Sequence, residues 1–180
     1  MMRLTGASLM VIATMLIVTA CTSPDRPSVQ ADEIALPTPI RSFDASLEEV
    51  VSQLQQAVAD AGSRLDTTDR PYRPSEPESL LYAPRVILRA DLADPDDGFV
   101  LVYALADATA ADERADDLAD YLGSGFGQTN YSADTRFSVA VVGDTVVFSS
   151  LSRGRSSDPD RAEGIFDAIA AVGERVEVRK

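Results

Sequence analysis

Four arginines are the side chains whose types and spacing could create a binding site in this sequence. Arg85 and Arg89 lie four residues apart in a segment with strand-like alternation, so both side chains should project from the same side. Arg153 and Arg155 follow a later predicted hairpin. If the two segments meet, their guanidinium groups would form a basic site suited to a carboxylate, a phosphate or a partner protein. The alternative is that each arginine pairs with neighbouring acidic residues.

The residue types that most enzymes use for acid–base or nucleophilic chemistry are almost missing. The chain has no His, a single Cys at position 21 and a single Lys at position 180. These absences exclude histidine catalysis, histidine metal ligands and an internal Schiff-base lysine. The absence of Trp also weakens the case for a sugar-stacking site. We therefore expect no catalytic residues, no cofactor and no metal, and a protein that is not an enzyme.

The charge balance is strongly acidic. Asp and Glu total 29 against 16 for Lys and Arg, which gives a formal net charge of -13. Such a surface repels nucleic acid and anionic lipid headgroups, because both are bound mainly through Lys and Arg. We therefore expect no nucleic-acid partner.

Two glycine-containing stretches resemble ligand-binding loops only superficially. A calcium loop needs acids at alternate positions, glycine at six and glutamate at twelve, whereas the run from Asp94 to Gly98 has acids at one, three and four and glycine at five, so a plain turn is expected. Gly123, Gly125 and Gly127 follow a predicted helix, whereas phosphate-binding glycines precede one. We interpret them as a helix end and a flexible connection.

The first twenty residues have the pattern of a targeting segment. Arg3 supplies a basic start, and an almost unbroken apolar run extends from Leu9 to Val18. A short apolar core after a basic start is typical of a secretory signal peptide. The following residues include four prolines between Thr22 and Asp44 and no apolar period, which predicts an extended tether.

The residues Val18-Thr19-Ala20-Cys21 resemble the lipobox of bacterial lipoproteins. The resemblance covers residues 1–21 only, and it implies cleavage after Ala20 and diacylglycerol attachment to Cys21. The expected location is the extracytoplasmic side of the cell membrane, where lipid on Cys21 holds the protein. The predicted organisation is a signal peptide at 1–20, a lipidated cysteine and tether at 21–44 and a single α/β domain at 45–180.

The domain shows the apolar periodicities of alternating helices and strands. A capping box from Ser46 to Glu49 begins the first predicted helix, and Asp158 with Pro159 begins the last one. Residues 63–79 are expected to be irregular. The predicted elements are a helix at 46–61, strands at 85–92 and 99–105, a helix at 108–122, a hairpin of 136–142 and 145–151, a helix between 158 and 173, and a short edge strand at 175–178.

This order, α-β-β-α-β-β-α with an optional last β, predicts an α+β fold. We expect a mostly antiparallel sheet of four to five strands with the helices packed on one face. The strand at 99–105 is apolar on both faces, which indicates a central, covered position. The outline is similar to small α/β lipoproteins with a helix–hairpin repeat, and distantly to the roadblock type of module. That likeness is one of element order, which does not carry function.

Three functions remain open from the sequence. The first is a lipid-anchored binding or accessory module of the cell envelope, with an envelope protein or a small ligand as partner. The second is a carrier of an apolar or lipid ligand, enclosed by residues of 99–105 and 137–148. The third is a hydrolase that uses carboxylates, although no pair of acids stands out.

Overall fold

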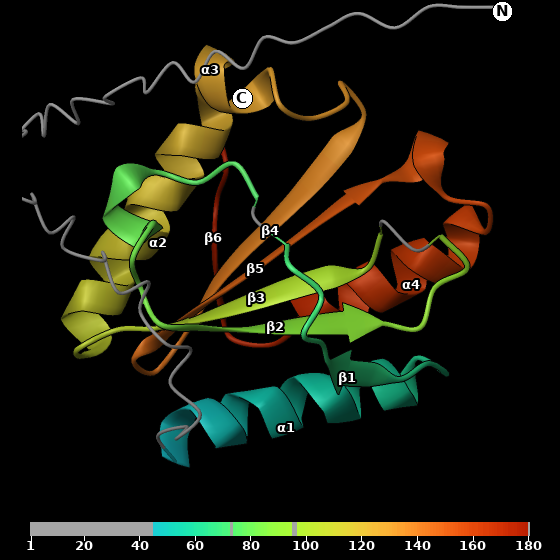
Figure 1. The fold of residues 1–180 in the computed structure, drawn as a ribbon, viewed down its shortest axis with the longest axis horizontal. Helices are drawn as coiled ribbons and strands as arrows, with labels where there is room; N and C mark the ends of the chain where they lie inside the picture. Colours follow the sequence, from blue (N-terminus) through green and yellow to red (C-terminus); the bar gives the residue numbers. More distant parts are fainter. Residues whose placement is uncertain (1–44, 73, 95–96, 180) are drawn as a thin grey trace, which may run out of the picture. The chain divides into compact units, whose positions relative to one another are not determined.

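Figure 1 shows the computed structural model, which describes residues 45–72, 74–94 and 97–179. The predicted signal peptide, the predicted lipidation site Cys21 and the predicted tether lie outside these residues and stay predictions. Among the helices that the structure describes, none has both the length and the apolar character needed to cross a bilayer.

The described residues form one open sheet of six strands, in the order β1-β2-β3-β5-β4-β6, with every neighbouring pair antiparallel. The strands are β1 (Leu65–Thr67), β2 (Arg85–Ala90), β3 (Phe99–Ala104), β4 (Thr135–Val142), β5 (Thr145–Ser152) and β6 (Glu174–Val176). The helices are α1 (Ala45–Asp60), α2 (Ala108–Gly123), α3 (Gly125–Gln128) and α4 (Pro159–Ala170), with short 3-10 helices η1 (Glu78–Leu80) and η2 (Arg153–Arg155). The predicted α+β class with an antiparallel sheet is confirmed.

The strand number exceeds the expected four to five because β1 lies in the segment predicted to be irregular. β1 has three residues, of which only Leu65 is buried, so the sequence shows no alternation there. It pairs with β2 from Leu65 opposite Ala90 to Thr67 opposite Leu88. At the other edge, β6 pairs with β4, which confirms the optional last strand.

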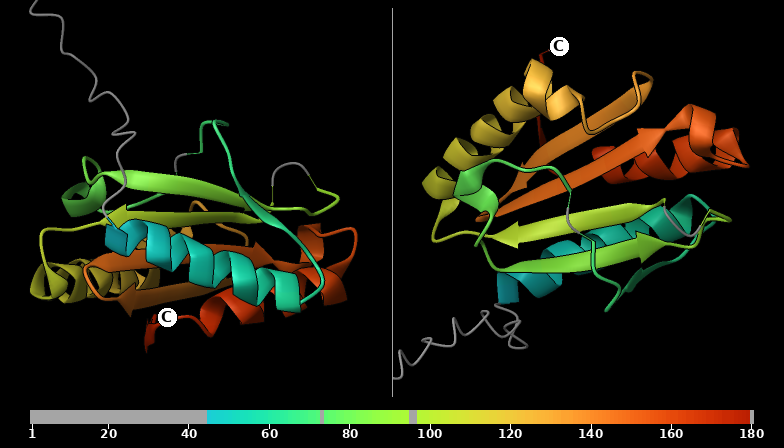
Figure 2. Two further views of the ribbon diagram at one scale, coloured as in Figure 1. Left: turned by 90° about the horizontal axis from the view of Figure 1, so that it is seen from below. Right: turned by 45° about the horizontal axis from the view of Figure 1, so that its top comes forward.

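The prediction that the helices pack on one face of the sheet is wrong. Residues of α1 and α4 share a core cluster with Val100 and Val102 of β3, whereas residues of α2 share another with Leu101 and Tyr103. Because neighbouring residues of a strand point to opposite faces, α2 covers the face opposite to α1 and α4. Figure 2 shows α2 and α4 on opposite sides of the β4–β5 hairpin. The two apolar faces of β3 require this double cover.

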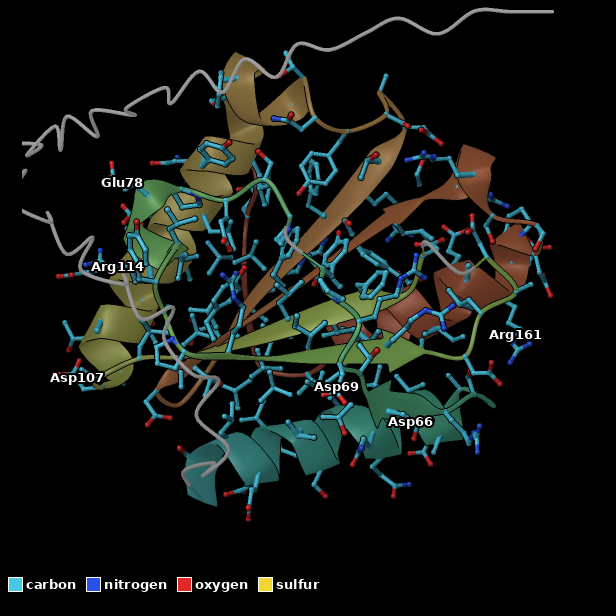
Figure 3. The ribbon with its side chains drawn as sticks, viewed as in Figure 1. Asp66, Asp69, Glu78, Asp107, Arg114 and Arg161 are labelled. Atoms are coloured by element: carbon cyan, nitrogen blue, oxygen red, sulfur yellow. The ribbon has the colours of Figure 1, made fainter. Side chains whose placement is uncertain are left out.

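Residues 68–72 and 74–84 form a crossing segment that joins β1 to β2. It runs from β1 across β2 and β3 to η1, which lies beside α2 (Figure 1). Figure 3 labels Asp69 near the start of this segment and Glu78 on η1 near its end. Leu80 of η1 is fully buried in the α2 core cluster, so the segment packs on the same face as α2.

Helix ends agree only partly with their sequence signals. Asp158 caps α4 as expected, Gly62 at φ 78° follows α1, and Asp107 caps α2. The expected capping box is not formed, because α1 already begins at Ala45 and the Ser46 hydroxyl donates to Asp144 Oδ2 at 3.3 Å.

The glycine stretch after α2 is not the flexible connection that the sequence suggested. α2 includes Gly123, and the Ser124 hydroxyl caps the short α3 by accepting from the Gly127 amide. A Cβ at Gly123 would collide with the backbone oxygen of Arg179, and one at Gly127 with that of Tyr121. Close backbone packing therefore explains these two glycines.

Candidate functional site

A buried ion pair anchors the crossing segment to the sheet. Arg85 Nη1 on β2 donates to both carboxylate oxygens of Glu76, at 2.8 and 2.6 Å, and the Tyr103 hydroxyl on β3 donates to Glu76 Oε2 at 2.6 Å. The Glu76 side chain is 2% exposed and that of Arg85 16%. Burial, and then the charge of Glu76, raise the pKa of the Tyr103 hydroxyl, which stays a neutral donor at pH 7. This anchor cluster of Glu76, Arg85 and Tyr103 is closed and satisfied.

The residue next to Glu76 ties the same segment to the α2 side of the domain. Ser75 Oγ lies 2.6 Å from the Tyr121 hydroxyl of α2 and accepts from Asn130 Nδ2 at 3.0 Å. The Tyr131 hydroxyl donates to the Ser75 backbone oxygen at 3.4 Å. These bonds fix the crossing segment relative to the loop that follows α3.

A cleft of about 580 Å³ opens beside these contacts, and we call it the polar cleft. Its lining comes from the crossing segment, the loop before β3, the loop before β4, and the ends of β3 and β5. Hydroxyl groups line much of it: Ser75, Ser132, Thr135, Ser150 and Ser152. Phe99, Leu101 and Tyr103 are alternate residues of β3 and therefore point to the same face of the sheet. Because Leu101 and Tyr103 pack in the α2 core cluster and Phe99 lines the cleft, the cleft lies on the face that α2 covers.

Aromatic rings form the other large part of the lining. The Tyr72 ring lies parallel to that of Phe99, with centroids 4.2 Å apart and an interplanar angle of 2°. Tyr131 meets Phe137 edge-on at 4.8 Å. Burial raises the pKa of both tyrosine hydroxyls, so both phenols are neutral at pH 7. The two tyrosines are therefore held in place as amphipathic walls with a polar end.

The loop before β3 contributes two acids, Asp94 and Asp97, to the cleft. Asp97 Oδ1 accepts from the Gly98 amide at 2.9 Å, whereas its Oδ2 is buried without a hydrogen-bond partner. Burial raises the pKa of the Asp97 carboxyl, the Gly98 amide lowers it, and the charge of Asp94 raises it. Arg89 behind this loop donates from Nη2 to the Asp94 backbone oxygen at 3.0 Å, and its Nε has no partner. Unpaired buried polar atoms are costly, which sets this end of the sheet apart from the anchor cluster.

The four arginines singled out from the sequence do not converge into one basic site. Arg85 belongs to the anchor cluster, and Arg153 pairs with Asp160 at 2.9 Å and Glu163 at 2.8 Å, as the pairing alternative expected. Arg89 packs with its guanidinium carbon 6.0 Å from the centre of the Phe99 ring. Arg155 alone lines the polar cleft, at the end of η2. Arg85 and Arg89 do project from the same face of β2, but from its two ends.

The sequence reasoning missed most residues of the polar cleft. Tyr72 and Ser75 lie in the segment taken as irregular, and Asn130 to Ser132 follow the stretch taken as a loop. One signal was present, because β5 changes from the apolar run Val146–Phe148 to the hydroxyls of Ser150 and Ser152 on the cleft face. Hydroxyls on a covered strand indicate a polar contact on that face.

The apolar residues proposed for a lipid-carrying cavity lie mainly in packed cores. Val100, Leu101, Val102 and Tyr103 are each 0% exposed and belong to the two core clusters. Within the described ranges, no group of three or more acidic side chains is arranged to hold a metal ion. The carboxylates of α2 that face outward (Asp112, Glu113, Asp116, Asp117 and Asp120) are exposed.

Comparisons of this chain with protein-family models, with curated proteins and with solved structures give no match.

Proposed function

We propose that this protein is a lipid-anchored, extracytoplasmic binding module that takes a small polar ligand into the polar cleft. The observation that carries this proposal is the cleft itself, which combines two fixed tyrosines, five aliphatic hydroxyls and Arg155 in about 580 Å³. Binding sites for small molecules are concave, of this size, and place a few polar groups among aromatic rings. The anchor cluster and Ser75 hold one wall in place, so little ordering is needed when a ligand enters.

A polar ligand suits this cleft better than an apolar one. Burying hydroxyls and carboxylates against a lipid chain would leave them unpaired, which costs free energy at each group. A ligand with its own hydroxyls or charges replaces the water that these groups lose. The packing of the β3 side chains into closed cores supports the same choice.

The anchor half of the proposal rests on the sequence of residues 1–21. We expect the Cys21→Ala variant to leave the membrane fraction and to lack the mass of the attached acyl chains. Fractionation with mass spectrometry of the intact chain measures both. A variant that stays in the membrane with unchanged mass would contradict the lipid anchor and leave the cleft untouched.

The binding half is tested on the full chain in detergent micelles. The chain has no Trp and five Tyr, so a change in tyrosine absorbance on adding a probe reports on Tyr72 and Tyr131 against a constant signal from the other three. Glucose, glucuronic acid and glutamate are titrated as polar probes into wild type, Ser150→Phe, which fills the cleft floor, and Ser157→Phe, an exposed control. We expect saturable binding of at least one probe in wild type and in the control only. Failure of all three probes, or binding unchanged by Ser150→Phe, overturns the proposal.

One observation favours a second candidate, a hydrolase that uses carboxylates. Asp94 and Asp97 both line the cleft, and the raised pKa of Asp97 is a property of general acids. Against it, Asp97 Oδ1 is held by the Gly98 amide and Oδ2 is buried, so neither oxygen faces a substrate freely. Incubation of the full chain with p-nitrophenyl glucuronide separates the two candidates, because only a hydrolase releases p-nitrophenol in amounts that exceed the enzyme.

A further inference from the structure

Arg155 differs from the arginines around it in having no ion pair within the part of the chain that the structure describes. Arg153, two positions earlier on η2, pairs with Asp160 and Glu163, and Arg136 pairs with Glu163 and Asp167. The charge of Arg155 lowers the pKa of the Asp97 and Asp134 carboxyls, but no ion pair joins it to either of them. In a protein with a net charge of -13, an arginine that lines a cleft without a carboxylate partner is open to an external anion.

The rest of the cleft offers groups that match a ring with several hydroxyls. Thr135, Ser150 and Ser152 lie on paired strands, where Thr135 is opposite Ser152 and Phe137 opposite Ser150. This register places the hydroxyls of Ser150 and Ser152 on one face, beside Tyr72 and Tyr131. Ser152 Oγ donates to Asp134 Oδ1 at 3.0 Å, so toward a ligand it accepts, and a sugar hydroxyl can supply the donor. The flat faces and polar ends of tyrosine suit a ring with apolar and polar surfaces.

We infer that the polar cleft binds an acidic sugar, a saccharide ring that carries one carboxylate, with the carboxylate at Arg155 and the ring hydroxyls on the serines and threonine of the floor. This inference rests on the proposed binding function and names its ligand class. The two cleft tyrosines take the stacking role for which the sequence offers no Trp.

The charges in the cleft favour a single carboxylate over a phosphate. Among the lining residues that the structure describes, Asp94 and Asp97 stand with Arg155, which gives one cation and two acids. A phosphate monoester carries close to two negative charges at pH 7 and meets more repulsion than a carboxylate from these acids.

The test uses pairs of sugars that differ only by the carboxylate-bearing group. The full chain in detergent micelles is titrated with glucuronic acid and glucose, and with N-acetylmuramic acid and N-acetylglucosamine, by calorimetry and tyrosine difference absorbance. We expect at least one acidic sugar to bind roughly tenfold or more tightly than its neutral partner at low salt, the size of one charge-assisted contact. A difference in the glucuronic acid pair places the preferred carboxylate directly on the ring, and a difference in the N-acetylmuramic acid pair places it on a side chain of the ring.

Three variants test whether Arg155 is responsible for the difference. Arg155→Gln should reduce the affinity for the acidic sugar to that for the neutral one, whereas Arg153→Gln should keep the difference. Arg155→Lys keeps the charge but loses the fork, so an intermediate affinity is expected. Matching thermal midpoints of all variants show that each is folded.

The outcomes that contradict the inference are distinct from those that contradict the proposed function. Equal affinity for acidic and neutral sugars, or a preference that survives Arg155→Gln, overturns the acidic-sugar inference while sugar binding still supports the binding module. Tighter binding of glucose 6-phosphate than of glucuronic acid overturns the choice of a carboxylate. Binding of none of the probes, glutamate included, overturns both.

Discussion

Arg85 and Arg89 lie on the same face of β2, but their surroundings make them opposites. At one end, Arg85 is enclosed with Glu76 and Tyr103, and hydrogen bonds engage both Glu76 oxygens and the Nη1 and Nη2 atoms of Arg85. At the other end, Arg89 donates one hydrogen bond to a backbone oxygen, its Nε has no partner, and the polar cleft lies beyond the adjoining loop. The buried cluster whose charges pair with each other holds the architecture, whereas at the incompletely paired end a ligand can supply the missing hydrogen-bond partners.

The largest expected effect tests the anchor cluster. Glu76→Leu leaves Arg85 and the Tyr103 hydroxyl buried without their carboxylate, so we expect a loss of about 3–5 kcal/mol in the free energy of unfolding. Urea unfolding of the full chain measures it. Glu78→Leu, on the exposed surface of η1, is the control and should change stability by less than about 0.5 kcal/mol. A loss below about 1 kcal/mol for Glu76→Leu would mean that the two ends of β2 are energetically alike.

A double-mutant cycle sharpens the same comparison. Replacing both partners, Glu76→Leu with Arg85→Met, removes the unpaired charge, so the double variant should be more stable than Glu76→Leu alone by about 2 kcal/mol. The Tyr103 hydroxyl still lacks its acceptor, which keeps the double variant below wild type. Additive losses from the two single variants would show that Glu76 and Arg85 do not act as a pair.

At the open end of β2, a comparable change should matter little. Arg89→Met removes one hydrogen bond to a backbone oxygen but also removes the unpaired Nε, so we expect a loss below about 1 kcal/mol. The same urea titration compares it directly with Arg85→Met. A loss above about 2 kcal/mol would place Arg89 in the architecture and erase the contrast.

The smallest expected effect depends on pH and concerns Asp97. Burial raises the pKa of this carboxyl above 3.8, so the folded state holds the proton more strongly than the unfolded state does. The contribution of the Asp97 carboxyl to the free energy of unfolding is therefore complete below pH 3.8, and it is lost as the pH rises through the pKa of the folded state. We expect Asp97→Asn to gain stability relative to wild type over that rise. Unfolding free energies of both proteins at a series of pH values measure the difference, and a relative loss would contradict the sign.

Several features of the fold follow from local sequence because they depend on neighbours in the chain. Asp107 and Asp158 cap their helices, and the Gly143 turn at φ 61° joins the β4–β5 hairpin. Each is decided by one side chain or one backbone angle. The two-sided apolar character of β3 also indicated a covered strand correctly. A strand that is apolar on both faces needs cover on both, which is incompatible with helices on one face only.

The polar cleft could not be predicted, because its residues come from segments far apart in the chain. Ser75 meets Tyr121 and Asn130 across the domain, and Tyr72 stacks on Phe99. Short loops and β1 carry no periodic pattern, so nothing local marks which of their side chains turn inward.

The sequence by itself determined the residue types available, the capped elements and the pattern of a lipoprotein signal, since composition and local backbone preference are properties of short stretches. Only the tertiary structure decided that Arg85 pairs with an internal carboxylate and that Arg155 lines a cleft without an ion pair among the described residues. The physical reason is that an ion pair requires charged atoms within a few ångströms of each other. Glu76 reaches Arg85 only because the crossing segment packs over β2, and no carboxylate of the described chain comes equally close to Arg155.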